Sequence, residues 1–243
     1  MNRATALAGA ALITLGGGGA CSTKDQPAPG TTTTTDSLAP TAMTDEWRAL
    51  FDGKTTTGWR EFGKTSISSG WQVIDGSLVR VANGAGDIIT DEQFRNFELE
   101  LEWKVPPGGN SGIFYRVTEQ ADTIWKAAPE MQILDDAVHA DGKSQLTSAG
   151  ASYGLYPAPR GVVRPADQWN TARLVVNGNH VEHWLNGTKL FEYELGSADW
   201  KDRYAKSKFN SMPLYGKAEQ GHIGLQDHGD RVMFRNIRIR VLP

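Results

Sequence analysis

The stretch Phe97-Glu98-Leu99-Glu100-Leu101-Glu102-Trp103 alternates strictly between apolar and acidic residues. Successive side chains of a β-strand point to opposite faces of the sheet, so this period of two is typical of a half-buried strand. In a helix, the same residues would spread their apolar side chains around the whole circumference. The segment therefore predicts an antiparallel sheet with one face in a core and the other in water.

Similar short segments follow one another over most of the chain, separated by turn dipeptides. Asp75-Gly76, Asn177-Gly178 and Asn186-Gly187 tolerate positive φ and suit tight hairpins. We predict further strands at 71–74, 78–81, 112–117, 130–134, 171–176, 180–185, 190–193, 222–227 and 232–241. No useful window shows a strong helical period. The pattern predicts an all-β fold, a two-sheet antiparallel sandwich or jelly roll.

The N-terminal segment has the features of an export signal. Arg3 precedes an apolar stretch over residues 4–15, and small residues lead to Cys21. This stretch is too short to span a bilayer as a helix, and its end resembles a bacterial lipoprotein signal. In that interpretation residues 1–21 are the signal and a lipid on Cys21 anchors the protein to a membrane of the cell envelope, periplasmic or surface-facing. Ordinary signal-peptidase cleavage with an incidental cysteine is the alternative.

Composition divides the rest of the chain and excludes some functions. Residues 22–44 are rich in Thr, Pro, Ser and Ala and predict a flexible tether, which leaves 45–243 as the folded domain. The net charge is −3, which gives no electrostatic case for nucleic-acid binding. Cys21 is the only cysteine, so no intramolecular disulfide can form.

Several motifs follow one another in an order that resembles a known family. They are LFDGK at 50–54, NSGIFYR at 110–116, PEMQILDD at 129–136, HWLNG at 183–187 and GHIGLQDHG at 221–229. Together they are similar to the 3-keto-disaccharide hydrolase domain family, over about residues 46–241. The resemblance implies a concanavalin-A-like jelly roll that acts on glycosides already oxidised at C3 of the sugar.

Strand parity predicts which side chains could form a sugar-binding groove. In the strand at 130–134, Glu130 and Gln132 share one face, and Met131 and Ile133 share the other. The apolar pair should enter the core, so the polar pair should face outward or line a groove. Parity gives two further sets of residues that share a face: Gly112, Phe114 and Arg116, and His222, Gly224, Gln226 and His228.

The chemistry implied by a C3 ketone needs few groups. The ketone acidifies the hydrogen on C2, a base removes it, and the C1 aglycone leaves by β-elimination; water then adds, so the net result is hydrolysis. This requires one base, one acid and a donor to the enolate oxygen. We assign Glu130 or His228 as base or acid and Arg116 as the oxyanion donor, with a salt bridge between Arg116 and Glu130 as an alternative. Substrate orientation is assigned to Gln132, Asp135, His139, Lys143, Gln226 and Asn110.

No cofactor follows from the sequence. A divalent ion held by Asp or His side chains could replace Arg116 as the electrophile, but no ligand spacing supports it. His180 and His183 are three residues apart and cannot share the face of a regular strand, which argues against a metal pair. His222 could join the site or bond to backbone. Sugar-stacking or core roles are both open for Trp125, Trp184 and Trp200, while Tyr153 and Tyr156 could cover the groove.

Two other functions use the same residues. A non-catalytic carbohydrate-binding lipoprotein would need only the fold and the aromatic platforms. A laminarinase-like glycosidase would need a second carboxylate four residues after Glu130, where the chain has Leu134. Arg235, Arg238 and Arg240 predict a solvated sheet face.

Overall fold

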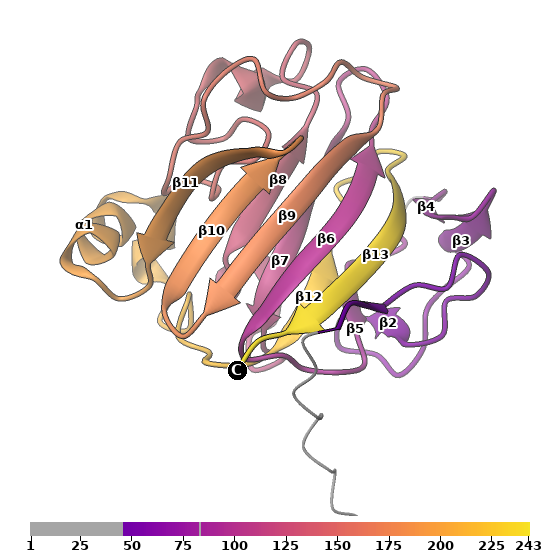
Figure 1. Cartoon of the computed structure of the whole chain (residues 1–243), viewed down its shortest axis with the longest axis horizontal. Coiled ribbons are helices and arrows are strands. Elements are labelled where there is room, and N and C mark those ends of the chain that lie inside the picture. Colours follow the sequence, from indigo (N-terminus) through magenta and orange to yellow (C-terminus); the bar gives the residue numbers. More distant parts are fainter. Residues whose placement is uncertain (1–45, 83) are drawn as a thin grey trace, which may run out of the picture. The chain divides into compact units, whose positions relative to one another are not determined.

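The computed structural model describes residues 46–82 and 84–243 (Figure 1). The predicted signal, the predicted tether and Cys21 lie outside these residues. Within them, the chain forms two antiparallel sheets, one of eight strands and one of five. The predicted all-β, jelly-roll-like sandwich is therefore confirmed. None of the helices in the described segments has the length and apolar character needed to cross a membrane.

The eight-stranded sheet is built around β6 (Phe97–Lys104), which pairs with β9 and β13. Phe97, Leu99, Leu101 and Trp103 are all buried in the core between the sheets, as the alternation predicts. On the other face, the acidic residues of β6 pair with arginines of β13. The remaining strands are β1 (Arg48–Ala49), β3 (Trp71–Ile74), β4 (Ser77–Arg80), β9 (Asn170–Asn177), β10 (His180–Leu185), β11 (Thr188–Glu194) and β13 (Met233–Val241).

The five-stranded sheet runs in the order β2-β5-β12-β7-β8. Its strands are β2 (Trp59–Glu61), β5 (Ile88–Thr90), β7 (Asn110–Val117), β8 (Glu130–Leu134) and β12 (His222–Leu225). Its inner face contributes Ile113, Met131 and Ile223 to the core. Its outer face carries a second small apolar cluster, in which the 3₁₀ helix η1 (Ile124–Lys126) packs Ile124 beside Phe114. This cluster divides the outer face into two ends.

Hairpin turns form where the sequence predicts them. Asp75 and Gly76 both have positive φ, of 50° and 72°, between β3 and β4. Asn186 and Gly187 have φ of 50° and 80° between β10 and β11. Such left-handed pairs match the twist of two antiparallel strands, so these dipeptides fix the register of both hairpins.

The single α-helix of the described residues, α1 (Ala198–Lys206), is absent from the sequence prediction. Of its nine residues only Trp200 is buried, so it has no apolar stripe for a periodicity search to find. The helix is held instead by a cap, in which the Ser197 side chain accepts from the Trp200 N–H, and by ion pairs four residues apart. The short strands β1, β2 and β5 were also not predicted, and β12 ends two residues earlier than expected.

A β-bulge changes the predicted place of Arg116. His222 pairs with Val117 but Gly224 pairs with Phe114, so β7 carries one extra residue there, and Arg116 has a φ of +53°. Val117, not Arg116, therefore joins Phe114 in the outer cluster. The Arg116 guanidinium donates instead to the carbonyls of Gly178 and Arg95. The prediction that Arg116 shares the face of Gly112 and Phe114 is wrong, because strict alternation does not survive a bulge.

Candidate active site

A pocket of about 200 Å³ lies on the outer face of the five-stranded sheet, at the end where β7 begins and β12 ends. Its walls come from β7, β8, η1, the loop after β12, and the 3₁₀ helices η2 (Ala140–Lys143) and η3 (Lys208–Ser211). The lining residues are Asn110, Trp125, Glu130, Gln132, Asp141, Tyr153, Lys208, Gln226 and His228. The structure thus brings together five of the nine residues to which the sequence assigned a catalytic or substrate-orienting role: Asn110, Glu130, Gln132, Gln226 and His228.

Glu130 is the buried acid of this pocket. Its residue is 6 % exposed, and burial raises its pKa from 4.5 to about 8. The nearby charge of Lys208 lowers this pKa, whereas those of Asp87 and Asp141 raise it. A carboxyl group with this pKa is protonated at neutral pH and can donate a proton.

A glycine on the neighbouring strand makes room for that carboxyl group. A Cβ added at Gly112 would lie 2.2 Å from Glu130 Oε1 and 2.8 Å from its Cδ. No side chain larger than hydrogen therefore fits there while Glu130 keeps its position. The Glu130 side chain lies across the β7 backbone because residue 112 is glycine.

Three amide oxygens around the pocket are buried without a hydrogen-bond partner among the described residues. They are Asn110 Oδ1, Gln132 Oε1 and Gln226 Oε1. The Gln132 amide is fixed, since its Nε2 donates to the Thr147 carbonyl at 3.2 Å. Buried polar atoms are rarely left unpaired in native proteins, so convergent free acceptors indicate a ligand that donates hydrogen bonds. Hydroxyl groups of a sugar are such donors.

Lys208 supplies a positive charge that the sequence analysis missed. Its Nζ lies 4.2 Å from the ring centroid of Tyr153 and 5.5 Å from that of Trp125. These are cation–π contacts, and no salt bridge to Lys208 occurs among the described residues. Lys208 belongs to a segment with no strand or motif signal, so only the fold could place it here.

Asp141 is the second carboxylate of the pocket and was also missed. It accepts a hydrogen bond from the Tyr153 hydroxyl at 3.1 Å. Burial and the charge of Asp141 raise the pKa of Tyr153 to about 12, so that hydroxyl keeps its proton. The only sequence signal at Asp141 was the Asp141-Gly142 turn dipeptide, which predicts a turn and not a site.

His228 lies exposed in the loop after β12, and the neighbouring Asp227 holds this loop in place. Asp227 forms an ion pair with Arg80 Nε at 2.6 Å and accepts from the backbone N–H groups of Gly86 and Gly229. The ring of His139 lies 6.5 Å from that of His228, almost perpendicular to it. His139 is not part of the lining; its Nδ1 accepts from the Asp141 N–H, so it positions η2.

Besides His139, three of the predicted site residues lie away from the pocket lining. Arg116 is bound to carbonyls beyond the bulge, and no ion pair joins it to Glu130 in the described chain. Asp135 accepts from the N–H groups of Gly108 and Ala137 and so shapes the loops on either side. Lys143 is exposed, and its carbonyl accepts from Arg160.

The predicted aromatic platforms divide in the same way. Trp125, which is 36 % exposed, and Tyr153 line the pocket. Trp200 is buried and stacks on Tyr204, and Trp184 lies on the eight-stranded sheet under Arg173. Tyr156 stacks on Tyr193 in the core.

The remaining histidines lie outside this pocket. His183 is buried, with Nδ1 2.9 Å from the Gly150 carbonyl, and burial lowers its pKa to about 4. His180 contacts Glu194 on the opposite face of β10, so the two histidine side chains do not share a face. One group of residues, made of His180, Glu182 and Glu192, has its ligand atoms close enough together to hold a cation. The Lys189 ammonium, however, already contacts the Glu182 carboxylate at 2.9 Å.

Comparisons with known proteins agree with this architecture. A family model described as a 3-keto-alpha-glucoside-1,2-lyase-like domain matches residues 46–240. A 3-keto-disaccharide hydrolase of Bacteroides thetaiotaomicron is 38 % identical over 238 residues, covering 85 % of this chain and 82 % of that protein.

Solved structures give the same result. A candidate glycosyl hydrolase from Parabacteroides distasonis is 35 % identical with a TM-score of 0.76, over 81 % of this chain and 94 % of that one. A second candidate glycosyl hydrolase from the same organism is 30 % identical with a TM-score of 0.63, over 81 % of this chain and all of that one. The family model covers most of the sequence, and the Bacteroides relative is 38 % identical to it. The chain therefore belongs to the 3-keto-alpha-glucoside-1,2-lyase-like domain family.

Proposed function

We propose that this protein is a glycoside-cleaving enzyme whose substrates are 3-keto-glycosides, 3-keto-disaccharides among them. The observation that carries the proposal is the burial of Glu130, which raises its pKa to about 8, beside three unpaired amide oxygens. The amide oxygens suit sugar hydroxyls, and the acid suits a leaving aglycone. The name of the Bacteroides relative and the description of the family support the oxidised substrate.

The proposed reaction is a β-elimination followed by hydration. His228 takes the proton from C2, the C2–H electrons form the C1=C2 double bond, and the C1–O bond to the aglycone breaks. Glu130 gives its proton to the departing oxygen. Water then adds to C1 of the enone and a proton returns to C2, so the net change is hydrolysis of one glycosidic bond.

Lys208 takes the role that the sequence analysis gave to Arg116. Its ammonium lines the pocket with Glu130, whereas the Arg116 guanidinium is bound to two backbone carbonyls. A positive charge beside the C3 oxygen stabilises the enolate as its negative charge develops. The contacts with Tyr153 and Trp125 hold that ammonium in place while the substrate binds.

Asp141 favours a second candidate, an ordinary glycosidase. Leu134, at the expected position of the second carboxylate, is fully buried, but Asp141 brings a different carboxylate into the pocket. Two carboxyl groups flanking one glycosidic bond can hydrolyse an unoxidised sugar. The two candidates differ in whether the C3 ketone is required.

A matched pair of chromogenic substrates separates these functions. Wild type, Glu130→Gln and the exposed control Glu46→Gln are assayed on a 3-keto-glucoside and on the corresponding glucoside. We expect turnover of the keto substrate only, with roughly a 10²- to 10⁴-fold lower kcat in Glu130→Gln and no change in the control. Release from the unoxidised glucoside supports the ordinary glycosidase, and equal rates in wild type and Glu130→Gln remove Glu130 from the chemistry.

The pH dependence of kcat tests which proton transfer Glu130 performs. As an acid it is active when protonated, so kcat should fall as the pH rises through its pKa of about 8. A rate that instead increases across this range assigns Glu130 as the base and His228 as the acid.

We also propose that the enzyme is held at a membrane of the bacterial cell envelope by a lipid on Cys21. The order of charged, apolar and small residues before that cysteine supports this location.

A further inference from the structure

A second hollow lies on the outer face of the five-stranded sheet, at the end opposite to the Glu130 pocket. It has a volume of about 500 Å³, within the usual range for small-molecule sites. Val117, the last residue of β7, and His222, the first of β12, are buried residues of its lining. At about 3.3 Å per residue, the seven steps along β7 place it more than roughly 20 Å from Asn110. The cluster of Phe114 and Ile124 lies between the two sites.

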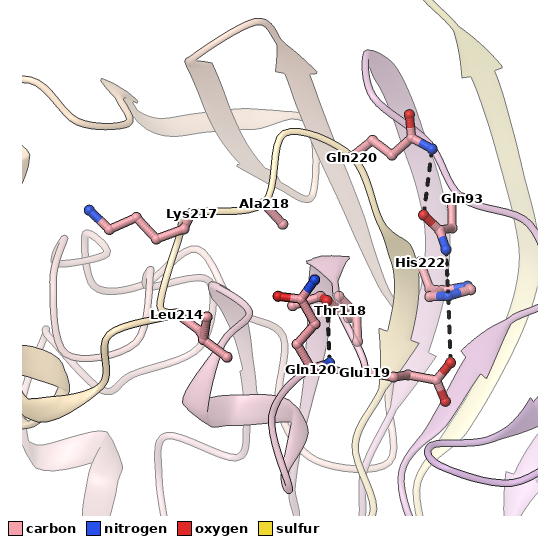
Figure 2. Close-up of a pocket in the computed structure, with 10 residues that line it drawn as sticks. Gln93, Thr118, Glu119, Gln120, Leu214, Lys217, Ala218, Gln220 and His222 are labelled. Carbon is pink, nitrogen blue, oxygen red and sulfur yellow. Dashed lines mark hydrogen bonds and ion pairs between the residues drawn. The ribbon is translucent and has the colours of Figure 1, made fainter.

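The hydrogen-bonding groups of this hollow are held in fixed directions (Figure 2). His222 Nδ1 lies 2.6 Å from the Thr90 carbonyl, so it carries the proton and Nε2 accepts from the Gln93 amide at 3.1 Å. The Gln93 carbonyl oxygen accepts in turn from Gln220 at 3.5 Å. Burial lowers the pKa of His222, which keeps the ring neutral. The chain therefore presents oriented amides above a neutral imidazole.

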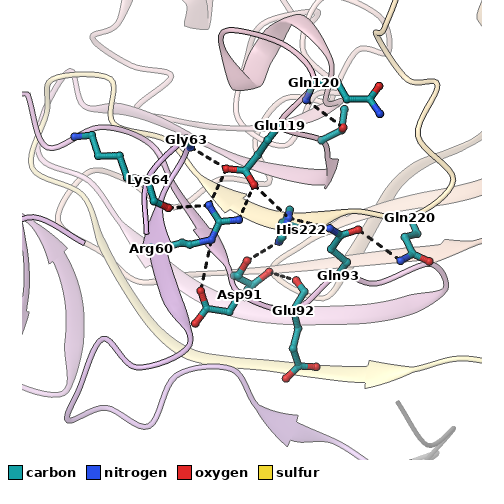
Figure 3. Close-up of polar contacts among 12 residues, drawn as sticks. Arg60, Gly63, Lys64, Asp91, Glu92, Gln93, Glu119, Gln120, Gln220 and His222 are labelled. Carbon is teal, nitrogen blue, oxygen red and sulfur yellow. Dashed lines mark hydrogen bonds and ion pairs between the residues drawn. The ribbon is translucent and has the colours of Figure 1, made fainter. Parts of the chain in front are cut away.

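Glu119 adds an acceptor that stays ionised. Two N–H groups of Arg60 donate to its carboxylate at 2.6 and 2.7 Å, and the Gly63 N–H donates at 2.9 Å (Figure 3). These contacts with Arg60 lower the pKa of Glu119 to about 2. The carboxylate lies 4.0 Å from His222 Nε2, so both groups face the same space.

The same groups exclude two classes of ligand. A metal ion would have to displace the guanidinium that occupies both oxygens of Glu119. A small anion would meet the Glu119 carboxylate, and the single ammonium of the lining, that of Lys217, only balances that charge. What remains is a neutral ligand whose groups both donate and accept hydrogen bonds, and hydroxyl groups do both. Leu214 and Ala218 give one wall an apolar surface, which suits the C–H face of a sugar ring (Figure 2).

We propose that this hollow is a second saccharide-binding site, which takes a neutral sugar independently of the reaction at Glu130. The lining amides of Gln93, Gln120 and Gln220 hydrogen-bond the hydroxyl groups, and the Glu119 carboxylate accepts from one of them. The site holds an unoxidised sugar as well as an oxidised one, because nothing in it requires a ketone.

Calorimetric titration of the full chain tests this site. The parent protein is Glu130→Gln, whose kcat we expect to be roughly 10²- to 10⁴-fold lower than that of wild type. The probes are the unoxidised sugars cellobiose, maltose and trehalose. We expect saturable binding of at least one of them, weakened roughly three- to tenfold by Gln93→Ala or Gln120→Ala through the loss of one hydrogen bond. The matched control Gln72→Ala changes an exposed glutamine on β3 and should bind as the parent does.

Two results would overturn the proposal. One is the absence of saturable binding for all three sugars, and the other is binding that Gln93→Ala and Gln120→Ala leave unchanged. Turnover of the chromogenic 3-keto-glucoside provides an independent readout in the otherwise wild-type protein. It should not change in Gln93→Ala, and a clear loss would assign the hollow to the catalytic site instead. Sugar binding is measured without turnover, so a failure to bind at the second hollow does not affect the proposed reaction at Glu130. Likewise, a failure of the proposed reaction does not affect the proposed binding site.

Discussion

The burial of Glu130 both makes it a proton donor and destabilises the folded protein at higher pH. Its side chain is buried with no hydrogen bond to a basic group among the described residues, and burial raises its pKa to about 8. The neutral carboxyl that results is a proton donor at neutral pH. The same burial disfavours the ionised form. The free energy of unfolding is therefore lowered at every pH at which the unfolded chain would ionise this group.

That penalty predicts a pH-dependent gain in stability for Glu130→Gln. Between the unfolded pKa of 4.5 and the folded pKa of about 8, the unfolded chain releases a proton that the folded protein keeps. The contribution of Glu130 to stability therefore falls as the pH rises through this window, and glutamine, which does not titrate, removes the loss. The free energy of unfolding, measured in urea at pH 5 and pH 8, should increase in the variant relative to wild type at the higher pH. An equal difference at both values would contradict the raised pKa.

Gly112→Ala should impair catalysis through the position of Glu130. The new Cβ would lie 2.2 Å from Glu130 Oε1, so the carboxyl group must move. We expect a fall in kcat of roughly 10²-fold, the effect of a misplaced catalytic group. The double variant with Glu130→Gln is the control, because the glycine acts through that carboxyl and should matter little once it is gone. Independent, additive losses would show that Gly112 acts in another way.

At the scale of the strand, the bulge in β7 decides what Arg116 does. One extra residue turns its guanidinium away from the pocket and toward the carbonyls of Gly178 and Arg95. Gly178 belongs to the turn between β9 and β10 of the other sheet. Arg116 therefore links the two sheets.

Arg116→Met should accordingly lower stability and spare catalysis. It removes the donor from the carbonyls of Arg95 and Gly178, two exposed residues that water can then solvate, so the expected cost is the net value of about 0.5–1.5 kcal/mol per hydrogen bond. Urea unfolding and turnover of the 3-keto-glucoside measure the two effects separately. A large loss of kcat at unchanged stability would return Arg116 to the role of oxyanion donor.

Across the whole molecule, the sequence predicts what depends on local pattern. The alternation of β6 and the turn dipeptides after Ile74 and Leu185 predict the sandwich, because burial of one strand face and left-handed turns are local requirements. Parity also predicts that Glu130 and Gln132 share a face away from the core. Parity selected four of the nine lining residues, Glu130, Gln132, Gln226 and His228.

The rest of the site depends on distant parts of the chain. Lys208 and Asp141 come from short 3₁₀ helices that carry no periodic signal, and only tertiary packing brings them to Glu130. Arg116 was misplaced because a bulge shifts the parity of a single strand. The second hollow has no pattern in the sequence because most of its lining lies in loops next to the ends of β5, β7 and β12.

The N-terminal segment leads to a prediction about the location of the whole protein. If a lipid on Cys21 holds it at a membrane, Cys21→Ser should move it from the membrane fraction to the soluble fraction without altering turnover of the 3-keto-glucoside. Fractionation of expressing cells, with wild type as the reference, measures this. Continued membrane association of the serine variant would require a different anchor.

The contact between Gly112 and Glu130 offers a way to sort related proteins. The glutamate can lie across the neighbouring strand only where the residue beneath it is glycine. Positions 112 and 130 therefore form a two-residue signature. A relative that keeps the glutamate but carries a bulkier residue at the position of Gly112, which pairs with Gln132 and lies diagonal to Glu130, should bind sugars without cleaving them. Genomic surveys could apply this criterion before any protein is purified.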